Sequence, residues 1–145
     1  MQGPLFISNR IQENFFYKQA ITNLGINDTI IVGGTNAIAK AVETQLPKVS
    51  ERIEGTTRYE TSVAIAKTKF ANSGLGYIAS GEVYADVLVI GPTAARNNAP
   101  VLLTPTAKAR PSVAEYIKNA KFEKLTVVGG TGRIPDAVVK ELTGK

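Results

Sequence analysis

The chain has 145 residues, 43% of them hydrophobic and 20% charged, so its length predicts about one globular domain and its composition argues against disorder. It contains no cysteine and no histidine, which excludes disulfides, thiolate and histidine metal sites, cysteine nucleophiles and Ser-His-Asp triads. The formal net charge of +5 favours an anionic partner.

Short apolar or β-branched runs alternate with stretches of helical character along the chain. The predicted strands span residues 5–8, 29–33, 77–80, 101–104 and 125–129. The predicted helices span residues 10–24, 36–46, 57 to about 74, 84–97 (with a kink expected at Pro92), 111–120 and 135–143. Thr57 and Glu60 form a Thr-x-x-Glu capping box, which supports the start of the third helix.

The predicted strands are continuous apolar runs, a pattern typical of a parallel sheet covered on both faces. We therefore expect an α/β fold, a three-layer α/β/α sandwich with a mainly parallel sheet of the Rossmann-like or flavodoxin-like kind. No stretch of 18 apolar residues occurs, so we expect no membrane span. The first residues lack the basic and apolar regions of a signal peptide, so we expect a protein that is not exported or a piece of a longer exported one.

The chain contains an internal repeat at a constant offset of 96 residues. Residues 4–46 align without a gap with residues 100–142, with 11 identities in 43 positions. We therefore divide the chain into residues 1–46, the back half of a preceding repeat, and residues 47–145, one complete repeat. Two generic βαβα units are the alternative interpretation.

Gly33-Gly34 and Gly129-Gly130 each follow a predicted strand and lead toward a predicted helix. Backbone N–H groups in such a turn bind phosphate or carboxylate in many proteins. A tight turn that needs a positive φ explains the same glycines. Neither turn has the spacing of a dinucleotide-binding or P-loop motif. A nucleotide- or phosphate-binding α/β domain therefore stays an alternative function.

Arg58 stands in the first turn of a predicted helix, where the helix dipole disfavours a positive charge. We expect either a carboxylate partner, Glu82 or Asp86, or an anionic ligand. Ser80 lacks a histidine base, so we expect it to cap the next helix together with Asp86 and predict no catalytic residue.

The stretch from residue 96 to residue 124 has the strongest charge bias in the chain. Its acidic residues are Glu115 and Glu123, and its basic residues are Arg96, Lys108, Arg110, Lys118, Lys121 and Lys124. A solvated helix face and a landing surface for a polyanion are both compatible with this bias. Few aromatic residues interleave with it, so we expect no nucleic-acid partner.

Several motifs, in one order, resemble the type 2 cell-wall-binding repeat of Gram-positive, mainly clostridial, surface proteins. The matching segments are Arg52-x-x-Gly55-x-x-Arg58-Tyr59-Glu60-Thr61, Ala79-Ser80-Gly81, Tyr84-Ala85-Asp86-Val87-Leu88, Ala99-Pro100-Val101-Leu102-Leu103-Thr104, Tyr116-Ile117 and Val127-Val128-Gly129-Gly130 with Ile134. Thr57 and Val87 depart from the Asp and Ala that are usual in the family. The resemblance covers residues 52–142 as one repeat and residues 4–46 as the back half of another.

The resemblance implies a non-covalent anchor of tandem repeats, of the kind found in S-layer proteins, that binds an anionic wall polysaccharide. It implies an extracellular location at the cell wall, sibling repeats or a second copy as partners, and no enzyme activity, cofactor, metal or membrane contact in this chain; a parent protein could carry a separate amidase or protease domain. Half a repeat would leave a sheet edge exposed, so a repeat–repeat oligomerisation module is a further alternative. The candidate polymer contacts are Arg52, Arg58, Tyr59, Arg96, Pro100, Val101, Leu102 and Leu103, the last four of which also suit a core strand.

Overall fold

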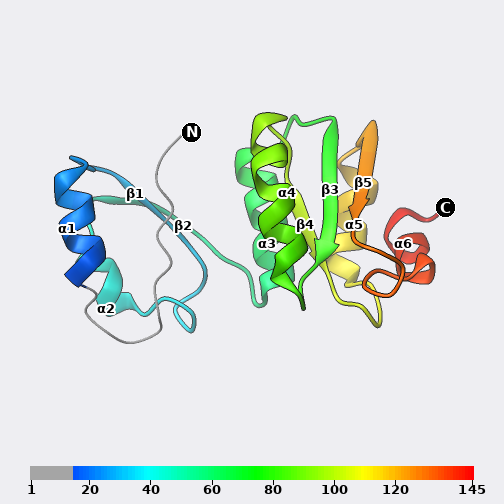
Figure 1. Cartoon of the computed structure of the whole chain (residues 1–145), viewed down its shortest axis with the longest axis horizontal. Helices are drawn as coiled ribbons and strands as arrows, with labels where there is room; N and C mark the ends of the chain where they lie inside the picture. Colours follow the sequence, from blue (N-terminus) through cyan, green and yellow to red (C-terminus); the bar gives the residue numbers. More distant parts are fainter. Residues whose placement is uncertain (1–14) are drawn as a thin grey trace. The chain divides into compact units, whose positions relative to one another are not determined.

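The computed structural model describes residues 15–145 (Figure 1). The chain divides into two compact units, residues 1–54 and residues 55–145. The strand expected at residues 5–8 and the first part of the helix expected at residues 10–24 lie outside the described residues. Each unit is a parallel α/β structure with its own sheet.

The first unit contains a two-stranded parallel sheet. Its elements are α1 (Phe15–Asn23), β1 (Thr29–Val32), α2 (Lys40–Glu43) and β2 (Val49–Ile53). The helix expected at residues 36–46 is wrong in length, because Ala39 is extended (φ −57°, ψ 150°) and only one turn of helix follows it. Strand β2 was not expected from the sequence. Its central residues are polar, and it is a strand because it pairs with β1.

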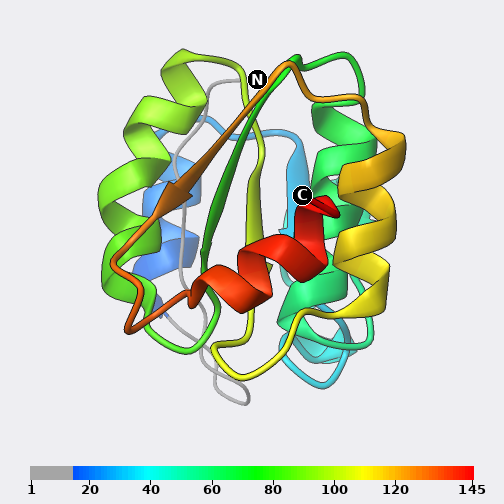
Figure 2. The same cartoon turned by 90° about the vertical axis from the view of Figure 1, so that its right-hand side faces the viewer.

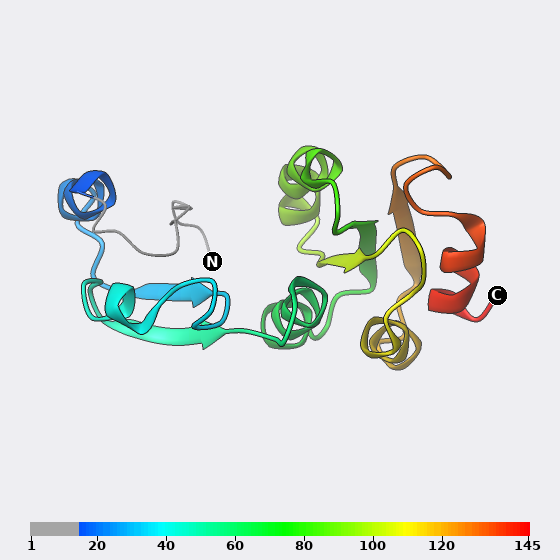
Figure 3. The ribbon, with the colours of Figure 1, turned by 90° about the horizontal axis from the view of Figure 1, so that it is seen from below.

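The second unit contains a three-stranded parallel sheet in the order β4-β3-β5. Its elements are α3 (Arg58–Lys69), β3 (Leu75–Ser80), α4 (Tyr84–Arg96), β4 (Val101–Thr104), α5 (Pro111–Asn119), β5 (Lys124–Val128) and α6 (Asp136–Thr143). Helix α4 covers one face of the sheet, and α3 and α5 cover the other (Figures 2 and 3). The expected three-layer α/β/α arrangement with a parallel sheet is confirmed.

The core of the second unit lies mostly between the sheet and helices α3, α5 and α6. Ile78, Leu102, Val113 and Leu142 are fully buried there. A smaller cluster on the other face joins Tyr77 to Ala94 and Ala99 under α4. Helix α4 runs through Pro92 without interruption and exposes Tyr84, Leu88 and Val89 on its outer side.

The start of α3 is fixed by the capping box that the sequence predicted. The Thr57 hydroxyl accepts the Tyr59 N–H (3.2 Å) and donates to the Glu60 carboxylate. The Gly55 N–H donates to the Thr61 hydroxyl (3.0 Å). A Cβ on Gly55 would lie 2.5 Å from the backbone of Glu60, so glycine is required for the loop to pack onto the helix. The Gly, Thr and Glu of the opening motif therefore serve the fold.

Truncating a core side chain should test this packing. Leu102 is completely buried in the sheet, so Leu102→Ala should lower the free energy of unfolding by about 2–5 kcal/mol through lost burial and a residual cavity. Leu88→Ala, the same change at a side chain that is 64% exposed, should change it by less than about 0.5 kcal/mol. Urea unfolding of both variants measures the difference, and equal effects would contradict the assignment of the core.

Candidate functional site

Arg52, one of the candidate polymer contacts, lies in β2 and is held inside the first unit. Its Nη1 donates to the backbone carbonyls of Gly33 (2.7 Å) and Ile38 (3.3 Å). Its Nη2 forms an ion pair with Glu43 at 2.9 Å, and only 14% of the arginine side chain is exposed. These bonds fasten β2 to the turn after β1, which is a structural role.

The two glycine turns share a positive φ at the first glycine, and a carboxylate lies beside each of them. Gly33 and Gly129 have φ values of 127° and 114°, so each needs glycine. The Gly33 N–H donates a hydrogen bond to the Ile53 carbonyl (2.8 Å). A Cβ on Gly34 would lie 3.2 Å from a Glu54 carboxylate oxygen, and one on Gly129 would lie 3.0 Å from Asp86, so each turn has a carboxylate beside it. Neither turn begins the helix that follows, since α2 and α6 each start seven residues after the first glycine of the pair.

Arg58 and Tyr59 lie at the carboxyl end of the second unit's sheet. Arg58 is exposed, and its Nη1 donates to the Gly81 carbonyl (2.6 Å) in place of the expected carboxylate. Tyr59 is 8% exposed, with the Arg110 guanidinium 5.2 Å from its ring centroid. A Cβ on Gly81 would lie 2.5 Å from the same ring. The ring of Tyr59, a candidate polymer contact, is therefore covered by the protein.

The segment from residue 100 to residue 103 is a core strand. Pro100 and Leu102 are fully buried, which removes them from any polymer contact in this conformation. Val101 and Leu103 are partly buried and pack against the clusters on opposite faces of the sheet. The core interpretation of this segment, one of the two that the sequence allowed, describes what these side chains do here.

The basic stretch does not form one surface, because its residues divide between the two ends of the sheet. Lys108 and Arg110 lie at the carboxyl end, after β4. Three carboxylates at that end are hydrogen-bonded within the unit: Glu60 to Ser112, Glu82 to the Thr106 N–H, and Glu141 to the Ala109 N–H. The carboxyl end therefore balances its positive charges with acidic groups of its own.

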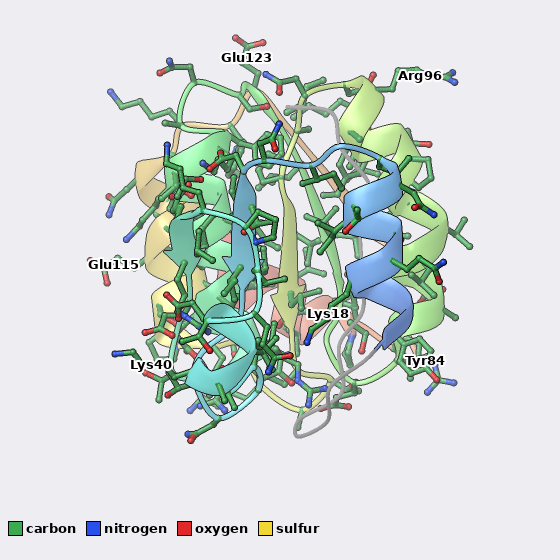
Figure 4. All side chains as sticks on the ribbon, turned by 90° about the vertical axis from the view of Figure 1, so that its left-hand side faces the viewer. Lys18, Lys40, Tyr84, Arg96, Glu115 and Glu123 are labelled. Carbon is green, nitrogen blue, oxygen red and sulfur yellow. The ribbon has the colours of Figure 1, made fainter. Side chains whose placement is uncertain are left out.

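The amino end of the sheet keeps an excess of positive charge. Helices α4 and α5 finish there, and β5 begins there. Figure 4 shows Arg96 and Glu123 at this end and Tyr84 at the opposite end of α4. We call this region the amino-end surface and define it by four exposed basic residues: Arg96, Lys118, Lys121 and Lys124.

A shallow groove of about 130 Å³ opens at the amino end on the α4 side of the sheet. Leu75, Gly76, Tyr77, Asn97, Lys124 and Thr126 line it. The Asn97 amide donates to the Tyr77 hydroxyl at 2.7 Å, which fixes both polar groups at the groove. Arg96 immediately precedes Asn97 at the end of α4. Sequence reasoning found Arg96 but missed Tyr77, Asn97 and Thr126, because each is a single polar residue from a different element.

The groove offers the groups that carbohydrate and anion recognition use. Two hydroxyls and an amide suit sugar hydroxyls, which both donate and accept hydrogen bonds. Lys124 in the lining suits phosphate or carboxylate, as does Arg96, which precedes Asn97 in the chain. Within residues 15–145, no group of three or more acidic residues is arranged to hold a metal ion. In the same part of the chain, no helix has the length and apolar character needed to cross a membrane.

Comparison with known sequences identifies a family to which the chain is similar. The model of the family described as cell wall binding domain 2 matches residues 52–139. The N-acetylmuramoyl-L-alanine amidase LytC of Bacillus subtilis is 32% identical over 143 residues, which is 97% of this chain and 29% of the amidase. The amidase enhancer of that organism is 34% identical over 89 residues, 60% of this chain and 12% of the enhancer. The chain therefore spans less than a third of either relative.

Two solved structures from Clostridium difficile share the architecture. Cwp8 superposes with a TM-score of 0.64 and 28% identity, covering 83% of this chain and 20% of Cwp8. Cwp6 superposes with a TM-score of 0.78 and 19% identity, covering 93% of this chain and 22% of Cwp6, and supports the fold alone.

The parallel α/β unit and its polar, basic groove define a binding module. The family match is more specific, since it covers more than half of the chain. The chain belongs to the cell wall binding domain 2 family. Membership assigns it to cell-wall binding, which confirms the resemblance stated from the motifs.

Glu60 should give the second unit an acid-sensitive contact. Hydrogen bonding from Thr57, and then from Ser112, lowers the pKa of Glu60 below its ordinary 4.5, although burial opposes the shift. A carboxyl group whose pKa is lower in the folded state stabilises the protein at pH values above its ordinary pKa. This stabilisation is lost as the pH falls through the lowered pKa of the folded state. Glu60→Gln should therefore flatten the decline of the unfolding free energy as the pH falls below the ordinary value of 4.5.

Urea unfolding across a pH series measures that decline. Glu115→Gln, on the exposed side of α5, is the matched control and should keep the slope of the unmodified chain. If Glu60→Gln declines as steeply as the control, the contact with Thr57 and Ser112 does not carry the acid sensitivity.

Proposed function

We propose that this chain anchors its parent protein non-covalently to the wall of a Gram-positive cell by binding an anionic wall polysaccharide. The observation that carries the proposal is the groove at the amino end, which Tyr77, Asn97, Thr126 and Lys124 line, with Arg96 next to Asn97 in the chain. In this proposal the module works outside the cell, at the wall. Residues 47–145 act as one complete repeat, and residues 1–46 as the back half of another.

The groove divides recognition between two kinds of group. The guanidinium of Arg96 and the ammonium of Lys124 take the phosphate or carboxylate of the polymer, with Lys118 and Lys121 adding long-range attraction. Tyr77, Asn97 and Thr126 take the sugar hydroxyls. A groove of about 130 Å³ holds little more than one sugar face, so each site is weak and a tandem array gains its strength from several sites on one chain.

The helix dipole gives a competing reason for some of these charges. Arg96 and Lys118 lie in the last turns of α4 and α5, where cations are stabilised by the helix itself. Lys121 and Lys124 lie outside any helix, so the dipole does not account for them. The place of Lys124 in the lining of the groove favours a ligand over helix stabilisation alone.

Arg58 stays a second candidate contact. It is exposed, and only its Nη1 is bound to a carbonyl, so the guanidinium keeps donors for an anion. The carboxylates around it make this end less attractive to a polyanion. The test below therefore compares the two ends of the sheet directly.

A salt series of binding to purified Gram-positive wall tests the proposal. Arg96→Ala with Lys124→Ala should weaken binding and make the log–log salt slope shallower by about two, roughly one for each lost ionic contact. Lys108→Ala with Arg133→Ala removes the same charge at the carboxyl end and should leave the slope nearly unchanged. Walls stripped of their secondary polymers by acid should not bind the unmodified chain.

Tyr77→Phe separates sugar recognition from charge. The change removes the hydroxyl that Asn97 contacts, so affinity should decrease several-fold while the salt slope stays the same. Equal losses for the two double variants would contradict the amino-end groove and leave net charge as the cause. A loss confined to Arg58→Ala would transfer the site to the carboxyl end.

A further inference from the structure

The outer edge of β5 has hydrogen-bonding groups that no strand in the described part of the chain pairs with. The second sheet has the order β4-β3-β5, so β5 is an edge strand. The Lys124 N–H donates to the Gly74 carbonyl (3.1 Å), toward β3. Because neighbouring residues of a strand point their N–H groups to opposite sides, the N–H groups of Leu125, Val127 and Gly129 point away from β3.

The repeat identifies what pairs with the same edge in the first unit. At the offset of 96 residues, Leu125 and Gly129 correspond to Thr29 and Gly33. The Thr29 N–H donates to the Lys48 carbonyl (2.9 Å), and the Gly33 N–H donates to the Ile53 carbonyl (2.8 Å). The edge of β1 that corresponds to the open edge of β5 is therefore the edge that binds β2 in parallel.

One position in the middle of the strand is more buried where the strand is paired. Ile31, in β1, is 3% exposed, whereas its repeat equivalent Val127 is only partly buried. No residue of β5 is buried, although five of the six residues of the central strand β3 are. The β5 edge thus resembles β1 without its neighbour.

The receptor for the Arg52 side chain is repeated as well. Arg52 binds the carbonyls of Gly33 and Ile38. In that turn the Gly34 carbonyl accepts the N–H groups of residues 37 and 38, and the Gly130 carbonyl accepts those of residues 133 and 134 in the same way. The carbonyls of Gly129 and Ile134 therefore correspond to the pair that holds Arg52. The position equivalent to Glu43 is occupied by Val139. An arginine docked in this turn would therefore bind the carbonyls of Gly129 and Ile134 but would have no carboxylate for an ion pair at that position.

We propose that the outer edge of β5 docks a strand of the β2 type, presented by another repeat and carrying the Arg-x-x-Gly opening motif. The strand adds in parallel to the N–H groups of Leu125, Val127 and Gly129. Its arginine binds the carbonyls of Gly129 and Ile134. Repeats of this kind are then joined by shared sheets, each completing the one before it. This inference is independent of the polysaccharide proposal.

An extended chain tests the docking. The offset places the equivalent of β2 at positions 145–149, so a copy of residues 49–57 attached after Gly144 has the same connection length as β1 to β2. Amide hydrogen exchange by NMR should slow at least about tenfold at Leu125, Val127 and Gly129 relative to the original chain. A copy whose arginine is replaced by alanine should give markedly less protection, and a scrambled copy none.

A second experiment uses a free peptide, because the attached extension could disturb the folding of the chain. A peptide of residues 47–57 added to the original full-length chain should protect the same three amides in a saturable way, and the amides of β3 report that the sheet stays intact. Unchanged exchange at the β5 edge with both the extension and the peptide would overturn the proposal. Protection in the original chain that appears only in dimers, by sedimentation, would also overturn it, because the occupant would then be a second copy.

Discussion

The pairing of β2 with β1 is the constraint on which the organisation of the chain depends. Parallel strands need a crossover between them, and the segment with α2 supplies it in the first unit. The pairing is secured by Arg52, whose guanidinium joins two carbonyls and Glu43. Removing the arginine would leave carbonyls and a carboxylate without their donor, which costs more than the bonds contribute when made. The opening strand of the sequence repeat thus belongs structurally to the preceding unit, and the compact units divide after Glu54.

The second unit shows how chain direction concentrates charge. In a parallel α/β structure every helix that follows a strand returns to the amino end of the sheet, so helix carboxyl termini gather there. Basic residues in the last turns of α3, α4 and α5 each suit the local dipole and together make that end positive. The carboxyl end receives the helix starts, and its acidic residues cap and brace loops, as Glu60 and Glu141 do. A preference that acts on single helices therefore produces an electrostatic difference between the two ends of the unit.

Sequence reasoning succeeded where structure follows from local pattern. The strand expected at residues 101–104 coincides with β4, and the Thr57 capping box begins α3, because an apolar run and a cap act within a few residues. It failed where the cause is distant in sequence. Strand β2 is too polar to be predicted as a strand without its pairing with β1. Tyr59 was predicted to contact the polymer, but Arg110 and Gly81, which are distant in sequence, pack against its ring. The groove was invisible for the same reason, since Tyr77, Asn97 and Thr126 come from separate elements.

The glycine turns show how one local sequence serves a purpose opposite to the one first expected. A turn of this kind was expected to present N–H groups to an anion. In the first unit the Gly33 N–H is already bound to β2, and it is the Gly33 carbonyl that faces outward, to a guanidinium. Both turns have a positive φ at the first glycine, which other residues adopt only with strain. In the first unit the turn therefore accepts a cation, the guanidinium of Arg52, which opens the next repeat.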